Sequence, residues 1–225
     1  MKRVERLGEA AAPDGTVMTL YRHDGAYALR VNNVELMNTR CFHSEEQLAE
    51  RVCLPLAGTP GARVLIGGLG FGFTLRAALR VLPADAAVVV AEIVAEVIEW
   101  NRNPEYPLAA GALADPRVEL RHADVSHVLR DGPGEYDAIM LDVDNGAGAL
   151  TTGANAALYR ANGVRTAAAA LRPGGRLAYW SAEAEPEFAA LLRRTGLEVD
   201  EVRVRAHAGR SGPRHTLLIA HAPAK

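Results

Sequence analysis

Apolar and polar residues along the chain change their spacing several times, and each change predicts a different element. Near the start they alternate in short bursts, which is typical of half-buried strands. The pairs Asp24-Gly25 and Asn32-Asn33 separate these bursts and favour tight turns. The pattern therefore predicts a small antiparallel β-appendage within residues 1–43. Its strands are expected at 17–21, 26–31 and 34–37.

The next stretch predicts a helix. Ser44-Glu-Glu-Gln47 has the spacing of a capping box and precedes apolar residues at helical intervals. We expect this helix to run into a linker over residues 55–61. His43 lies just before the cap, at the junction with the main domain, where it can either contact a substrate or serve as a polar neighbour of the cap.

From residue 62 onward, strand patterns and helix patterns alternate. Five β–α repeats predict a parallel sheet with helices on both faces. The expected pairs of strand and helix are 63–66 with 74–82, 87–91 with 94–100, 117–120 with 125–129, 136–141 with 155–171, and 176–180 with 185–195.

The last two apolar segments, 199–205 and 215–220, have no helix between them. The turn residues at 209–213 join them directly, which predicts an antiparallel hairpin. A doubly wound, Rossmann-like α/β sheet that ends in such a hairpin is the architecture of class I methyltransferases. We expect it to occupy residues 44–225 as one domain.

Composition narrows the functional classes. The chain has 225 residues, 49% of them hydrophobic, and a net charge of −2, so it can bury a large core and has no global field for nucleic acid. A small-molecule substrate is the expected partner. Arginines do gather late, and a solvated helix end and hairpin explain them better than an RNA-binding surface. They are Arg193, Arg194, Arg203, Arg205, Arg210 and Arg214.

Targeting and metal signals are missing from the sequence. Cys41 and Cys53 have neither metal nor redox spacing, and the seven histidines form no paired zinc motif. The start MKRVERLGEA has no apolar signal region, and no apolar run is long enough to span a bilayer. We expect a cytoplasmic protein with no metal and no membrane partner, and a homodimer is left open.

A glycine turn lies between the first strand of the repeats and its helix. Gly68, Gly70 and Gly72 place backbone N–H groups at a helix N-terminus, where a nucleoside can approach closely. The dinucleotide fingerprint needs its third glycine where Phe73 stands, so the spacing favours an adenosylmethionine-type ligand over NAD. A tight turn with no ligand is the alternative.

Acidic residues follow the next two strands. Glu92 ends the second strand about twenty residues after the turn, where a carboxylate can bind both ribose hydroxyls. An ordinary solvated glutamate is the alternative. Asp124 follows the third strand and can accept a hydrogen bond from an adenine amino group, or cap the helix that begins at Val125, or do both.

The fourth strand ends in Asp142-Val-Asp144-Asn145-Gly146, at the centre of the sheet. A carboxylate there can hold an amine nucleophile or accept its proton, so we expect Asp142 to be catalytic and Asp144 and Asn145 to contact the substrate. An Asx-turn that merely ends the strand is the alternative. Trp180 ends the fifth strand and can wall the substrate pocket or belong to the core.

Together these segments resemble the spermidine synthase-like family, the aminopropyltransferase branch of the class I methyltransferase fold. The resemblance covers nearly the whole chain and rests on the helix entry at His43, the glycine turn, Glu92, Asp124 and the strand that ends at Asp142. It implies that Glu92 binds ribose, that Asp124 binds adenine, and that Asp142 handles the attacking amine.

The chain also departs from that family. Where spermidine synthases have an aspartate inside the glycine turn, this sequence has Phe71. His43 and Ser44 replace a tyrosine and a glutamine at the helix entry, and Asn145 replaces the second aspartate of the catalytic loop. Because a carboxylate at Phe71 would repel the carboxylate of intact S-adenosylmethionine, its absence favours the intact cofactor.

The sequence therefore predicts a transferase with an S-adenosylmethionine-type cofactor. Methyl transfer to a small amine-like acceptor is the first expectation, with Phe71 among the cofactor-binding residues. Aminopropyl transfer from decarboxylated S-adenosylmethionine is the alternative. A non-catalytic nucleoside-binding protein of the same fold is a third hypothesis, and only a turnover assay separates it from the others.

Overall fold

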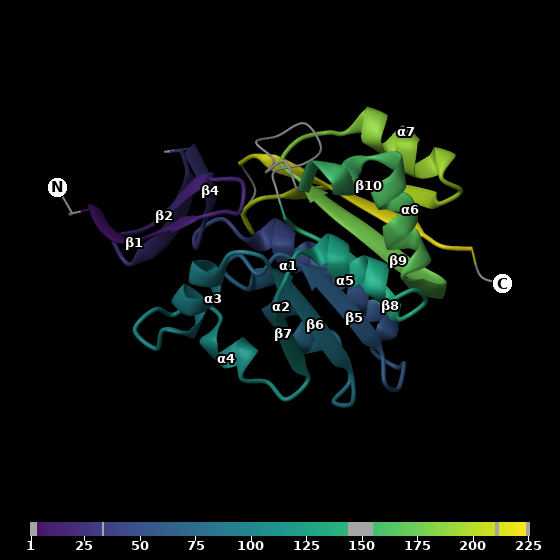
Figure 1. Cartoon of the computed structure of the whole chain (residues 1–225), viewed down its shortest axis with the longest axis horizontal. Coiled ribbons are helices and arrows are strands. Elements are labelled where there is room, and N and C mark those ends of the chain that lie inside the picture. The colour runs from purple at the N-terminus through teal and green to yellow at the C-terminus, as the bar shows by residue number, and fades with distance from the viewer. Residues whose placement is uncertain (1–3, 33, 144–154, 210–211, 224–225) are drawn as a thin grey trace.

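The computed structural model describes residues 4–32, 34–143, 155–209 and 212–223, and contains two β-sheets. A four-stranded antiparallel sheet has the order β1-β2-β3-β4, and a seven-stranded mixed sheet has the order β10-β11-β9-β8-β5-β6-β7. Figure 1 shows the small sheet beside one end of the large one, with helices packed on both faces of the latter.

The small sheet is the predicted β-appendage, with one strand more than predicted. Strand β1 was missed because most of its side chains are exposed and its sequence has no regular alternation. It pairs with β2 along the whole length of that strand. The four strands are β1 (Val4–Ala11), β2 (Val17–His23), β3 (Ala26–Val31) and β4 (Val34–Asn38).

The large sheet confirms the predicted doubly wound α/β fold with a terminal hairpin. Its five strands from β7 to β9 run parallel to one another, and β11 returns antiparallel between β9 and β10. The strands are β5 (Arg63–Gly67), β6 (Ala87–Glu92), β7 (Val118–His122), β8 (Tyr136–Leu141), β9 (Leu171–Ser181), β10 (Glu198–Arg205) and β11 (Arg214–His221).

Helices cover the large sheet because its strands are apolar on both sides. Val64 and Ile66 of β5 pack into a cluster with the helices of one face, and Leu65 between them joins the cluster of the other face. Helices α1 (His43–Cys53), α2 (Phe73–Val81) and α3 (Ala95–Arg102) belong to the first face. Helices α5 (Val125–Asp131), α6 (Ala161–Ala169) and α7 (Pro186–Arg194) belong to the second.

Two local predictions were wrong, and one short helix was missed. Ser44 does not cap α1: the N-cap is Phe42, which has no side-chain hydrogen bond, and Ser44 lies inside the helix. The helix expected over 155–171 is a 3-10 turn (Asn155–Tyr159) followed by α6, and β9 already begins at Leu171. The short helix α4 (Ala110–Leu113) was not predicted, and a further 3-10 turn spans Leu54–Leu56.

A third cluster joins the small sheet to the glycine turn. Leu20, Tyr27 and Leu29 of the small sheet are buried against Phe71 and Phe73, which belong to the turn and the start of α2. The Phe73 ring also stacks on Phe42, with 4.5 Å between the ring centres. The small sheet is therefore held directly over the turn. A domain boundary at residue 43 remains a prediction.

This docking can be tested with Leu20→Ala. Leu20 is fully buried in the cluster, so truncating it should lower the free energy of unfolding by about 2–4 kcal/mol. Val34→Ala on the same sheet is the control, because Val34 is 53% exposed and its loss should cost less than about 0.5 kcal/mol. Urea denaturation measures both variants, and equal stabilities would show that the cluster does not hold the sheet.

Candidate active site

The glycine turn follows β5 and is shaped by two close contacts. Gly68 has a φ of +87°, and a Cβ there would lie 2.5 Å from the Asp142 carbonyl oxygen at the end of β8. Gly70 has a φ of +51°, and its Cβ would meet the Met37 side chain of β4 at 2.9 Å. Only glycine fits these two positions without moving its neighbours. The turn therefore lies between the central strands and the small sheet.

Glu92 fixes the conformation of this turn. Its two carboxylate oxygens accept hydrogen bonds from the backbone N–H groups of Leu69 and Val94, each at 2.9 Å. The side chain is buried, and burial raises its pKa while these backbone donors lower it. The acid expected to bind ribose thus also ties the glycine turn to the end of β6.

A cavity of about 290 Å³ lies at the carboxyl ends of β5, β6 and β8. This is the point where the strand order reverses, which is the usual ligand site in such sheets. The predicted residues Gly68, Gly70, Glu92, Asp124 and Asp142 all line it. The structure therefore brings five predicted residues from four separate segments to one pocket.

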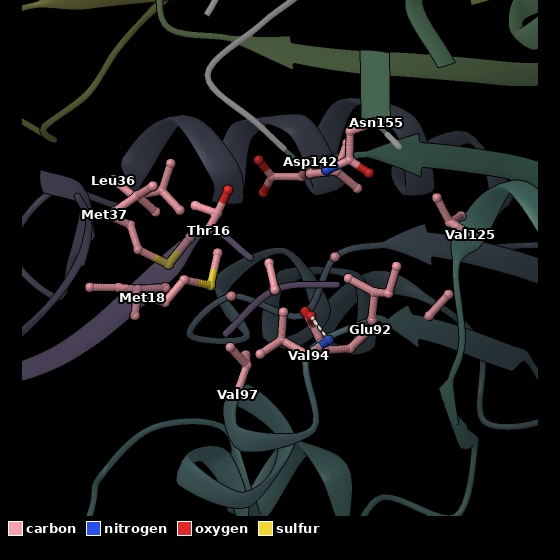
Figure 2. Close-up of a pocket in the computed structure, with 18 of the residues that line it drawn as sticks. Thr16, Met18, Leu36, Met37, Glu92, Val94, Val97, Val125, Asp142 and Asn155 are labelled. Atoms are coloured by element: carbon pink, nitrogen blue, oxygen red, sulfur yellow. Dashed lines mark hydrogen bonds between the residues drawn. The ribbon is translucent and has the colours of Figure 1, made fainter. Parts of the chain in front are cut away.

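The small sheet forms the other wall of this pocket, which the sequence did not indicate. Figure 2 shows the Asp142 carboxylate turned toward the side where Thr16, Leu36 and Met37 lie. Met18 lies on the same side of the pocket. Alternation in the sequence predicts that these strands have a buried face, but not what that face covers.

Asp124 has the helix-capping role that the sequence allowed. It is the N-cap of α5, and its Oδ1 accepts a hydrogen bond of 2.7 Å from the Ser126 N–H. The residue also lines the pocket. Capping and ligand binding are compatible because the cap uses one carboxylate oxygen.

Asp142 lies at the end of β8, with its backbone N–H bonded to the Gly67 carbonyl at 3.0 Å. The Thr74 hydroxyl donates a hydrogen bond of 3.0 Å to its Oδ2. Burial raises the pKa of Asp142 to about 6, and the Thr74 bond opposes that rise. A carboxyl group with a pKa this near neutrality can accept a proton at pH 7 and release it again.

Glu45 is a second acid with a raised pKa, and no sequence pattern gave it a functional role. It lies in the first turn of α1, where burial and the neighbouring Asp142 raise its pKa to about 7. One signal could have found it. Glu45 precedes the fully buried Ala49 by four residues and therefore lies on the inward side of the helix.

Four predicted residues do not line the pocket. Phe71 is buried in the cluster under the small sheet, and Gly72 packs against Ala109. His43 begins α1, where its N–H bonds to the Ala206 carbonyl. Trp180 is in the core, edge-on to the His215 ring at 4.6 Å. Asp144 and Asn145 lie outside the described residues.

The described residues contain neither a metal-binding cluster nor a membrane-spanning helix. Among residues 4–32, 34–143, 155–209 and 212–223, no three His, Cys, Asp or Glu side chains are grouped as a metal ion would require. No helix in the described part of the chain is long and apolar enough to cross a membrane.

The chain is similar in sequence to polyamine aminopropyltransferases. It is 27% identical over 148 residues to that of Leptospira biflexa, a match that covers 66% of this chain and 50% of the relative. It is 36% identical over 115 residues to polyamine aminopropyltransferase 2 of Pseudomonas aeruginosa, covering 51% and 32%. The chain thus spans about half the length of the Leptospira biflexa relative and about a third of the Pseudomonas aeruginosa one. No protein-family model matches it.

The fold is similar to that of solved spermidine synthases. The Thermotoga maritima enzyme superposes with a TM-score of 0.73 and 19% identity, over 98% of this chain and 74% of that one. A spermidine synthase in complex with the transition-state analogue AdoDATO gives a TM-score of 0.72 and 17% identity, over 98% and 73%. This chain therefore has the spermidine synthase fold. The resemblance inferred from its residues is confirmed, and so is the fold.

The close contact of the glycine turn with Asp142 can be tested with Gly68→Ala. The added Cβ would meet backbone at a positive φ, so we expect a loss of about 2 kcal/mol or more in the free energy of unfolding. Gly58→Ala is the control, since nothing lies within 4 Å of its Cβ position, and it should be neutral or slightly stabilising. Similar stabilities of the two variants in urea would contradict the contact.

The raised pKa of Asp142 predicts how stability depends on pH. The carboxyl group binds its proton more tightly in the folded chain, so its contribution to stability is complete below about pH 4 and is lost as the pH rises through about 6. Asp142→Asn removes the buried charge and should make the protein about 1–3 kcal/mol more stable at pH 8. The difference should vanish near pH 4 in thermal unfolding. A gap that is equal at both pH values would show that ionisation is not its cause.

Proposed function

We propose that this chain is an aminopropyltransferase that uses decarboxylated S-adenosylmethionine and a small amine acceptor. The observation that carries the proposal is the charge of the pocket. Glu92, Asp124 and Asp142 are acids, and no Arg, Lys or His is among the described residues that line it. An acidic pocket with no cation favours ligands with ammonium groups over ligands with a carboxylate.

The contacts of the glycine turn also favour the decarboxylated cofactor. Methyl transfer would require backbone N–H groups in the turn that can receive the carboxylate of intact S-adenosylmethionine. The Gly68 N–H bonds to the Ala91 carbonyl, and the Gly72 N–H bonds to the Leu69 carbonyl, both at 2.8 Å. The Leu69 N–H bonds to Glu92. Three donors of the turn are therefore already engaged.

Phe71 was the main reason to expect methyl transfer, and its position weakens that reason. The ring packs against Tyr27 and Leu29 of the small sheet and does not line the pocket. The absence of an aspartate at position 71 therefore does not tell us the charge inside the pocket. The relatives named above are aminopropyltransferases, which also favours aminopropyl transfer.

The residues of the pocket fit a nucleoside cofactor. Gly68 and Gly70 line the pocket without side chains, and the Glu92 carboxylate beside them is the group we assign to the ribose hydroxyls. Asp124 Oδ2 is the oxygen we assign to the adenine amino group. The bound cofactor would supply a sulfonium carbon as the electrophile. Asp142 would hold the acceptor amine and take its proton.

Competition calorimetry with the two forms of the cofactor tests this proposal. The decarboxylated form should bind at least tenfold more tightly, which corresponds to about 1.4 kcal/mol. Asp142→Asn should reduce this preference because it removes one negative charge from the pocket, whereas Glu183→Gln, outside the pocket, should keep it. Equal or tighter binding of intact S-adenosylmethionine would contradict aminopropyl transfer and favour methyl transfer.

A further inference from the structure

Asn101 is a buried polar residue near the end of α3, and the function proposed above does not use it. It is 1% exposed and does not line the pocket. Its Nδ2 group donates to the carbonyls of Gly70 and Val97, each at 2.8 Å, and its Oδ1 accepts from the Ala109 N–H at 3.2 Å. Both hydrogens and the oxygen of the amide therefore have partners, and the opposite orientation of the amide would lose all three bonds.

The bond to Gly70 is the one that reaches the site. Gly70 lines the pocket, and its N–H is one of the backbone donors that lower the pKa of Glu92. The carbonyl of the same residue is held by Asn101, which lies outside the pocket lining. Gly70 is thus held through both of its polar groups, and its carbonyl oxygen is directed away from the pocket.

A turn of this composition needs anchors of this kind. Gly68, Gly70 and Gly72 all have a positive φ, which glycine adopts as readily as a negative one. Such a backbone has several accessible arrangements, and Glu92 restrains only the N–H side of it. A carbonyl that turned toward the pocket would take up space that a ligand needs. A donor on the far side of the turn removes that arrangement.

Arg76 of α2 is a second anchor on the same side. Its guanidinium donates to the Phe71 carbonyl at 3.1 Å and to the Leu108 carbonyl at 2.8 Å. Asn101 makes the parallel link, because it binds both Gly70 and Ala109. The two side chains therefore tie two consecutive carbonyls of the turn to two consecutive residues of the segment that follows α3.

We propose that Asn101 is a positioning residue for the cofactor: it holds the Gly70 carbonyl out of the pocket and so keeps the glycine turn in the arrangement that admits a nucleoside. The inference rests on the proposed function, because it takes the pocket to be the nucleoside site. It adds a residue of α3 that does not touch the ligand to the groups that set the affinity for it.

This role predicts a particular kinetic effect. If loss of the anchor leaves the turn in the binding arrangement for only a tenth of the time, the apparent dissociation constant of the cofactor rises about tenfold. Once bound, the cofactor holds the turn in place, and the acid at the end of β8 is unchanged. The KM for the cofactor should therefore rise while kcat stays within about twofold. Partial unfolding alone would lower kcat and leave the KM unchanged.

Calorimetry of methylthioadenosine with the full chain tests the effect on binding. Asn101→Leu keeps the approximate shape of the side chain and removes its hydrogen bonds, so it should bind about tenfold more weakly than the native protein. Leu192→Ala is the control, because Leu192 is fully buried in the core around α7 and does not line the pocket. It should lose stability and keep the native affinity.

Asn101→Ser guards against a leucine variant that does not fold. A serine hydroxyl can bond the Val97 carbonyl one turn back in the helix, but it is too short to bridge to Gly70. This variant should therefore show the same weakened binding as Asn101→Leu.

Amide hydrogen exchange followed by NMR tests the anchor without any ligand. The Leu69 N–H is protected by its bond to Glu92, so it reports how often the turn opens. In the Asn101 variants it should exchange at least tenfold faster than in the native protein. The amides of Val64 and Ile66 in β5 are the internal reference, and their rates relative to the Leu192→Ala variant correct for any global loss of stability.

These results separate the inference from the proposed function. Native affinity and native Leu69 exchange in the Asn101 variants would overturn the inference and leave the proposed function intact. An equal loss of affinity in Leu192→Ala would overturn it as well, since stability alone would then explain the effect. Methylthioadenosine that does not bind the native chain would contradict the proposed function, and Leu69 exchange would still decide whether Asn101 holds the turn.

Discussion

The contact of Glu92 with the glycine turn is the interaction on which the site depends. One carboxylate binds the Leu69 N–H of the turn and the Val94 N–H that begins the path into α3. It therefore fixes the end of β6 against the end of β5. Because a buried carboxylate without such donors would be costly, the turn and the acid stabilise each other.

The fixed turn then determines what can pack around it. Gly68 touches the backbone of Asp142, so the turn sets how close β8 comes to the pocket. Gly70 touches Met37, so the turn also sets how the small sheet closes the other side. Acids from three strands are thereby gathered in one partly buried place. Burial raises the pKa of Glu92 and of Asp142, so their negative charges cost stability at neutral pH, and we propose that the same charges suit the pocket to ammonium groups.

The fold could be predicted from the sequence because the patterns that indicate it involve neighbouring residues. Continuous apolar strands, the glycine turn and the hairpin without a helix all concern neighbouring residues, and so does the Asp124 cap. Predictions were wrong where a residue distant in the sequence determines the local structure. Ser44 has the sequence of a cap, but its hydroxyl lies beside Glu45 and His215, and His215 is far away in the chain.

The same limit applies to the site. Strand-end acids could be assigned to a pocket because parallel strands end at one edge of a sheet. Phe71 could not be placed, since its partners lie in a sheet whose docking has no local signal. Trp180 likewise belongs to the core because α1 and the hairpin enclose it. Spacing shows which residues share an element, and packing decides which of them meet.

We propose that an acidic pocket makes this chain transfer an aminopropyl group to an amine. The most direct measurement supplies the full chain with an aliphatic diamine and equal amounts of intact and decarboxylated S-adenosylmethionine, and follows the products by mass spectrometry. We expect the diamine lengthened by one aminopropyl group, together with methylthioadenosine. A methylated diamine, or an unchanged diamine with both cofactors intact, would contradict it.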